Sequence, residues 1–152
     1  MLHWKDPRGW VPWSRGSAPL ILDEPHPTGT LPMAVRCRFG SLAAELAMLD
    51  TGAYWTLIGS ASIELLGAEL GEETGSVRVS SRLGSFPGTL HRLSIHLIAD
   101  QGESICVDGT CLALPDWRGP NVLGVHGCLE RLRFALEPDS AHTEARIHFG
   151  PV

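Results

Sequence analysis

The chain has 152 residues and a formal net charge of −5, from 12 basic and 17 acidic side chains. Its length suits one domain with a hydrophobic core, and its composition, 43% hydrophobic and 19% charged, is typical of a soluble globular protein. The acidic balance and the lack of a basic stripe argue against nucleic acid or an anionic membrane surface as a partner.

Residues 1–30 differ in composition from the rest of the chain. They hold five of the eleven prolines and three of the five tryptophans, Trp4, Trp10 and Trp13. We expect an irregular arm that its tryptophans pack onto the domain; the alternative is a processed or regulatory segment that occupies a groove. The first residues lack the apolar core of a signal peptide, and no later apolar run is long enough to cross a bilayer. We therefore expect a cytoplasmic protein.

From residue 31 onward, short strand patterns alternate with turn signals. Gly40-Ser41 is expected to join the first two strands into a hairpin that leads to Asp50. Ser60 is expected to cap a short helix that ends at Gly67, and residues 128–131 read as one helical turn. The expected strands are residues 33–39, 42–49, 54–58, 77–82, 90–99, 104–114, 122–124, 134–136 and 145–149.

These patterns predict the fold class of residues 31–152. Many short strands, with turn signals about every eight to twelve residues, are typical of an all-β barrel-like fold. The two helical patterns are short. We therefore predict one all-β, closed-barrel-like domain with one or two short helices.

The tripeptide Asp50-Thr51-Gly52 is the strongest functional signal. It places a carboxylate, a hydroxyl and a glycine in a tight loop between two apolar runs that read as buried strands. A charge there costs on the order of several kcal/mol unless it is paired or functional. An ordinary hairpin turn is the alternative interpretation, because Asp and Gly are common turn residues.

Two further segments fit the same site. The first is the tip Leu83-Gly84-Ser85-Phe86-Pro87-Gly88-Thr89, where Gly84 and Gly88 would permit a mobile turn with positive φ. A plain exposed hairpin is the alternative for this tip. The second is Val122-Leu123-Gly124, which is expected in the core under either interpretation.

In this order, the three segments resemble the retropepsin-like family of aspartic peptidases, the single-domain retroviral-type enzymes and their bacterial relatives. The resemblance covers residues 31–150, and the final Arg-Ile-His-Phe-Gly is similar to the closing strand of such bacterial relatives. It implies an acid-protease (retropepsin) fold and an aspartic endopeptidase.

The resemblance also implies a role for each segment. Asp50 would be the catalytic carboxylate, Thr51 would brace the site through its hydroxyl, and Gly52 would let the chain turn. Because the sequence holds one such motif, the site would need two subunits, and the partners would be a second copy and a peptide or protein substrate. The substrate-binding residues would be Ala53, Tyr54, Leu83, Gly84, Ser85, Phe86 and Gly88, and the loop would be supported by Val122, Leu123 and Gly124.

The chain departs from the viral pattern at two positions. Viral enzymes usually carry an acidic residue where this chain has Tyr54 and an arginine where it has Val125, and these form an ion pair that supports the dimer. A catalytically silent module that binds an extended peptide or a partner protein is therefore the alternative function. An N-terminal arm that inhibits the peptidase is a further possibility.

Other chemistries find little support in the sequence. No Gly-x-Ser-x-Gly elbow, phosphate loop, dinucleotide fingerprint or His-Glu-x-x-His motif is present. His96 and His126 read as core or surface histidines. The cysteines show no zinc-type spacing, so we expect no metal and no cofactor. Their apolar neighbours favour reduced, buried thiols, with a disulfide framework as the alternative, for Cys37, Cys106, Cys111 and Cys128.

Overall fold

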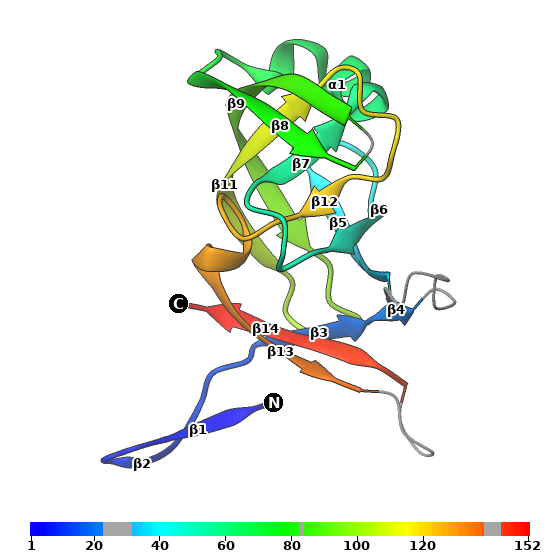
Figure 1. The fold of residues 1–152 in the computed structure, drawn as a ribbon. Coiled ribbons are helices and arrows are strands. Elements are labelled where there is room, and N and C mark those ends of the chain that lie inside the picture. The colour runs from blue at the N-terminus through cyan, green and yellow to red at the C-terminus, as the bar shows by residue number, and fades with distance from the viewer. Residues whose placement is uncertain (23–31, 83, 139–143) are drawn as a thin grey trace.

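Most of the fold is built from strands. The structure is a computed structural model and describes residues 1–22, 32–82, 84–138 and 144–152. Within these ranges there is a main sheet of eight strands, with smaller sheets of four and two strands (Figure 1). The predicted all-β class is confirmed. The strands of the main sheet are β4 (Ile21–Leu22), β5 (Met33–Phe39), β6 (Glu45–Leu49), β7 (Thr56–Gly59), β8 (Gly75–Ser81), β9 (Gly84–Leu97), β11 (Ile105–Leu114) and β12 (Val122–Leu123).

The main sheet closes on itself, which confirms the barrel-like arrangement. Its strand order is β4-β5-β6-β12-β7-β11-β9-β8, and an additional pairing joins β5 to β9. The strands between β5 and β9 therefore form a ring with one face inside. Every second side chain along a strand points into this ring and fills it. Along β9, Leu93, Ile95 and Leu97 are buried, whereas the neighbouring Arg92 is exposed.

The predicted hairpin and helix are both present. β5 and β6 pair antiparallel and lead to Asp50, as expected. The helix α1 (Ser60–Leu66) ends at Gly67, where φ is +50°. The prediction that Ser60 caps it was wrong: Gly59 is the N-cap, and the Ser60 hydroxyl accepts a hydrogen bond from Arg118 Nη1 at 2.7 Å. Two short 3₁₀ turns are η1 (Gly67–Leu70) and η2 (Leu129–Arg131).

The N-terminal residues form strands, so the expectation of an irregular arm was wrong. The four-stranded sheet consists, in order, of β10 (Gln101–Gly102), β3 (Gly16–Pro19), β14 (Arg146–Pro151) and β13 (Leu132–Glu137). β3 therefore pairs with a strand from the opposite end of the chain, and this pairing satisfies the backbone of the proline-containing segment. Residues 23–30, the rest of the expected arm, lie outside the described residues.

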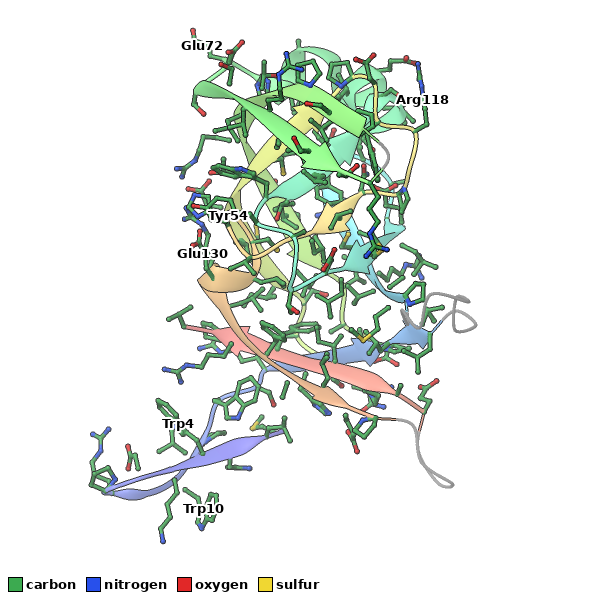
Figure 2. The ribbon with its side chains drawn as sticks, in the orientation of Figure 1. Trp4, Trp10, Tyr54, Glu72, Arg118 and Glu130 are labelled. Carbon is green, nitrogen blue, oxygen red and sulfur yellow. The ribbon has the colours of Figure 1, made fainter. Side chains whose placement is uncertain are left out.

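A two-stranded hairpin precedes this sheet. It consists of β1 (His3–Asp6) and β2 (Gly9–Pro12), and Figure 1 shows it extending away from the other two sheets. Trp4 and Trp10 lie on opposite sides of the hairpin (Figure 2). The Arg133 guanidinium lies 4.1 Å from the centre of the Trp4 ring, whereas Trp10 is 69% exposed. Trp4 therefore contacts Arg133 of β13, whereas most of the Trp10 side chain is exposed.

All four cysteines are free, as predicted. Cys37, Cys111 and Cys128 are buried, but the expectation that Cys106 is buried was wrong. Cys106 lies on the outer face of β11, one position before the buried Val107. Burial raises the pKa of the Cys128 thiol to about 12 and holds the other two buried thiols well above their usual pKa.

Across the described ranges, no helix combines the length and the apolar character needed to span a membrane.

Candidate active site

The loop that carries Asp50 connects β6 to β7 and is held by its own backbone. The Asp50 amide donates to the Leu123 carbonyl at 3.1 Å, which fixes the start of the loop against β12. The Asp50 Oδ1 atom accepts the Gly52 amide at 2.8 Å, and the Asp50 carbonyl accepts the Ala53 amide at 3.2 Å. Asp50 is half-buried, whereas Thr51 and Gly52 are exposed. These bonds turn the chain sharply and hold the carboxylate in one orientation.

The segment after β12 runs alongside this loop. The Val125 amide donates to the Ala53 carbonyl at 2.9 Å, and the His126 amide donates to the Tyr54 carbonyl at 2.7 Å. β12 itself pairs parallel with β6 and antiparallel with β7. The first and third sequence segments thus meet side by side, although about seventy residues separate them along the chain.

Gly124 makes this close approach possible. A Cβ atom on Gly124 would lie 2.2 Å from the Trp55 carbonyl oxygen and 2.9 Å from the Ala53 carbonyl oxygen. Both neighbours are backbone atoms, which cannot rotate away. No larger residue fits at this position without moving the loop.

Thr56 supports the same contact, and sequence reasoning missed it. Its hydroxyl is fully buried, accepts the Gly124 amide at 3.2 Å, and faces the Gly124 carbonyl at 3.4 Å. Because a buried hydroxyl is costly without a partner, this pair explains a polar residue inside the apolar run 55–58. That interruption was the available signal.

Asn121 is a second buried polar residue that sequence reasoning missed. Its Oδ1 atom accepts the Gly59 amide at 2.9 Å, and its Nδ2 atom donates to Glu45 Oε1 and Ser62 Oγ, each at 2.6 Å. One buried side chain therefore joins the start of β6, the end of β7 and α1. An asparagine before an apolar pair is also typical of a turn, so the sequence carried no specific signal for this role.

A cavity of about 420 Å³ lies beside the loop. We name its two sides by their residues. The loop wall comprises residues 52–55 together with Leu57, and the strand wall comprises residues 77–80 of β8. Since β8 ends the strand order of the main sheet, its outer edge has no strand partner within the described residues. The cavity is therefore an open slot between a fixed loop and a free strand edge.

The predicted substrate-binding residues fall into two groups. Ala53 and Tyr54 line this cavity, whereas Gly84, Ser85, Phe86 and Gly88 lie on β9, at the inner edge of β8, and do not line it. Leu83 lies outside the described residues.

The residues at the tip have other contacts. The Phe86 and Trp117 rings meet edge to face with centroids 5.8 Å apart. Gly84 has the expected positive φ, +128°. Gly88 is extended within β9, contrary to expectation, and a Cβ atom there would lie 2.7 Å from the Ala113 carbonyl oxygen. The lack of a side chain at Gly88 thus allows close packing of β9 on β11.

An aromatic cluster includes Tyr54, one of the two positions at which the chain departs from the viral pattern. Tyr54 stacks on His126 with ring centroids 5.4 Å apart, and Trp55 meets His126 edge to face at 4.6 Å. The His126 Nδ1 atom lies 3.1 Å from the Glu130 carboxylate, on the same side of the molecule as Tyr54 (Figure 2). The Gly127 amide donates to Glu130 at 2.9 Å, and this bond, aided by His126, lowers the pKa of Glu130 below its usual value.

The charged groups around the loop are few. Asp50 forms no ion pair with any residue that the structure describes, so its carboxylate faces neither a cation nor a second carboxylate of its own chain at ion-pair or hydrogen-bond distance. In the described part of the chain, no three His, Cys, Asp or Glu side chains are grouped so that they could hold a metal ion.

Comparison with known proteins shows the fold. No protein-family model and no curated protein sequence matches the chain. A retropepsin-like aspartic protease from Rickettsia conorii is similar in structure, with a TM-score of 0.53 and 18% identity over 84% of this chain and 97% of that chain. The crystal structure of edgp is also similar, with a TM-score of 0.53 and 12% identity over 92% of this chain. The match covers 47% of edgp, so the chain spans about half of it. The predicted retropepsin-like fold is confirmed.

Proposed function

We propose that the protein is an aspartic endopeptidase that acts as a homodimer, with one Asp50 from each subunit in the catalytic pair. The observation that carries the proposal is the position of Asp50: it is half-buried, its backbone and carboxylate are held by three hydrogen bonds, and the residues that follow it, 52–55, line an open slot with a free strand edge. The retropepsin-like fold of the chain supports the same conclusion.

A second subunit follows from the chemistry of the carboxylates. The sequence has one Asp-Thr-Gly motif, and one carboxylate cannot act at once as base and as acid. Two carboxylates about 3 Å apart share one proton, and the two dissociation steps belong to the pair. The ionised member takes a proton from water, which attacks the peptide carbonyl, and the protonated member donates a hydrogen bond to the carbonyl oxygen. Thr51, whose side chain is exposed, would reach the loop of the partner subunit.

The substrate would bind as an extended peptide. An extended backbone can add to the free edge of β8 through strand-type hydrogen bonds, while its side chains enter the cavity. Ala53 and Tyr54 would contact it directly from the loop wall, and the pairing of β8 with β9 would hold the strand wall in place. Val122, Leu123 and Gly124 would keep the Asp50 loop in place.

Peptide cleavage by the Asp50→Asn protein tests the proposal. Amide replacement removes the shared proton and the base while it keeps the size of the side chain, so we expect no measurable cleavage and an unchanged melting temperature. Asp116→Asn removes the same charge at an exposed position and should keep full activity. Cleavage by Asp50→Asn at the wild-type rate would refute the peptidase assignment.

One observation favours the second candidate, a catalytically silent module that binds an extended peptide. Tyr54, which stacks on His126, and Val125 stand where viral enzymes carry the ion pair that supports the dimer. Sedimentation equilibrium of the wild-type protein separates the two functions. A dimer at micromolar concentration supports the peptidase, whereas a strict monomer leaves one carboxylate per site and supports the binding module.

A further inference from the structure

The charge of the cavity indicates what kind of peptide it accepts. This inference rests on the proposed function. Among the described residues that line the cavity, Arg78 is the one with a formal charge at neutral pH, and the others are glycine, aliphatic, aromatic or hydroxyl residues. The protein as a whole is acidic, with a net charge of −5. The cavity therefore presents a local positive charge on an acidic protein.

The Arg78 guanidinium has no carboxylate beside it. Across the strand pair, Arg78 lies opposite Pro87 of β9. The next residues on the same face of β8 are Ser76 and Ser80, opposite Thr89 and Ser85, and all four are uncharged. Arg78 forms no ion pair with any described residue, so its charge is available to a ligand.

Arg78 is exposed on its face of β8, whereas Val77 and Val79 are half-buried on the other face. A carboxylate of a bound peptide can therefore reach the guanidinium from solvent. A guanidinium also binds a carboxylate through two parallel hydrogen bonds, which a lysine cannot do.

The alternation along β8 sets the pattern of the peptide. In an added strand, the residue opposite Arg78 points to the same face as Arg78, and its two neighbours point to the other face. Those neighbours would meet Val77 and Val79, which face that side. The strand wall therefore matches a peptide with one acidic residue between two apolar residues.

We propose that Arg78 is a specificity-determining residue, which selects extended peptides that carry Asp or Glu between two apolar residues. Its carboxylate partner belongs to the substrate, and Val77 and Val79 contact the flanking apolar side chains.

Competition between two peptides tests this proposal. The peptides are identical except for Glu or Lys between two apolar residues, and kcat/KM is measured for wild type, Arg78→Glu and the control Arg82→Glu. Arg82 follows β8 and is exposed, but it does not line the cavity. Wild type and Arg82→Glu should both prefer the Glu peptide by about threefold to fivefold, as expected for an exposed ion pair. Arg78→Glu should prefer the Lys peptide. An unchanged preference in Arg78→Glu, or an equal change in both variants, would overturn the proposal.

Binding measured without catalysis separates this proposal from the peptidase assignment. Fluorescence anisotropy of the two dye-labelled peptides is recorded with Asp50→Asn protein, with and without Arg78→Glu. Tighter binding of the Glu peptide, reversed by Arg78→Glu, supports the role of Arg78 even if wild type cleaves neither peptide. Equal binding of both peptides refutes the role of Arg78 even if wild type cleaves them.

Discussion

The two walls of the cavity are supported in different ways. The loop wall is held from behind by residues that do not line the cavity: Gly124 allows close approach, and the buried Thr56 hydroxyl accepts the Gly124 amide. The strand wall belongs to an edge strand that is bonded on one side only, to β9. Its residues are half-buried or exposed.

This difference separates stability from recognition. Residues behind the loop wall have no space to move and no alternative partners, so changes there should lower the free energy of unfolding. Residues of the strand wall can change without disturbing the core, so changes there should alter which peptide binds. One cavity thus combines a fixed side next to Asp50 with a side whose residues can vary.

The same substitution behind the loop wall and at the start of β8 gives the largest expected contrast. Gly124→Ala places a Cβ atom 2.2 Å from a backbone oxygen, so we expect it to lower the free energy of unfolding by about 3 kcal/mol or more. In Gly75→Ala, at the start of β8, the new Cβ atom lies 3.4 Å from Leu90 Cδ1, an ordinary contact. Urea unfolding monitored by circular dichroism measures both.

Gly75→Ala should leave stability unchanged or raise it by about 0.5 kcal/mol, because alanine restricts the unfolded chain more than glycine does. Equal loss of stability in the two variants would show that the walls are supported alike, and it would contradict the comparison.

Loss of the Thr56 hydroxyl should have a smaller effect. Thr56→Val keeps the shape of the side chain and leaves the buried Gly124 amide without the acceptor that it has at 3.2 Å. We expect a loss of about 2 kcal/mol in the free energy of unfolding. Thr56→Ser keeps the hydroxyl and removes one methyl group, and it should lose about 1 kcal/mol. A Thr56→Val protein as stable as wild type would mean that the hydroxyl does not support the loop.

The regions that were predicted correctly are those whose signals are local. The hairpin before Asp50 follows from alternation and a Gly-Ser turn, and the helix end at Gly67 follows from the preference of glycine for positive φ. The position of the 122–124 segment came from the family resemblance, because nothing in its own residues specifies a partner so distant in sequence.

Two of the errors share a cause, which is pairing between distant segments. Proline content suggested irregular structure before residue 22, but β3 gains a partner in β14, at the far end of the chain. Thr56 and Asn121 were missed for the same reason, since their partners lie 59 to 76 residues away. The error at the tip is local: residues 84–89 belong to β9 and pair with the preceding strand β8.

Glu130 provides the smallest and most specific test, because its carboxylate accepts the Gly127 amide and contacts His126, which stacks on Tyr54 of the loop wall. Its pKa is lowered in the folded protein, so its charge stabilises the fold above the usual pKa of a glutamate, and this contribution is lost as pH falls through the lowered value. Glu130 is partly exposed, so Glu130→Gln should lower the free energy of unfolding by less than about 1 kcal/mol at pH 7.

Urea unfolding of Glu130→Gln and wild type, at pH 7 and at acidic pH, measures this effect. The difference in the free energy of unfolding should shrink as the wild-type carboxylate becomes protonated. Glu64→Gln removes a charge from an exposed helical position and should show no such trend. A difference that stays constant with pH would mean that the amide and His126 contacts do not depend on the charge of Glu130, and that Tyr54 is held by ring stacking alone.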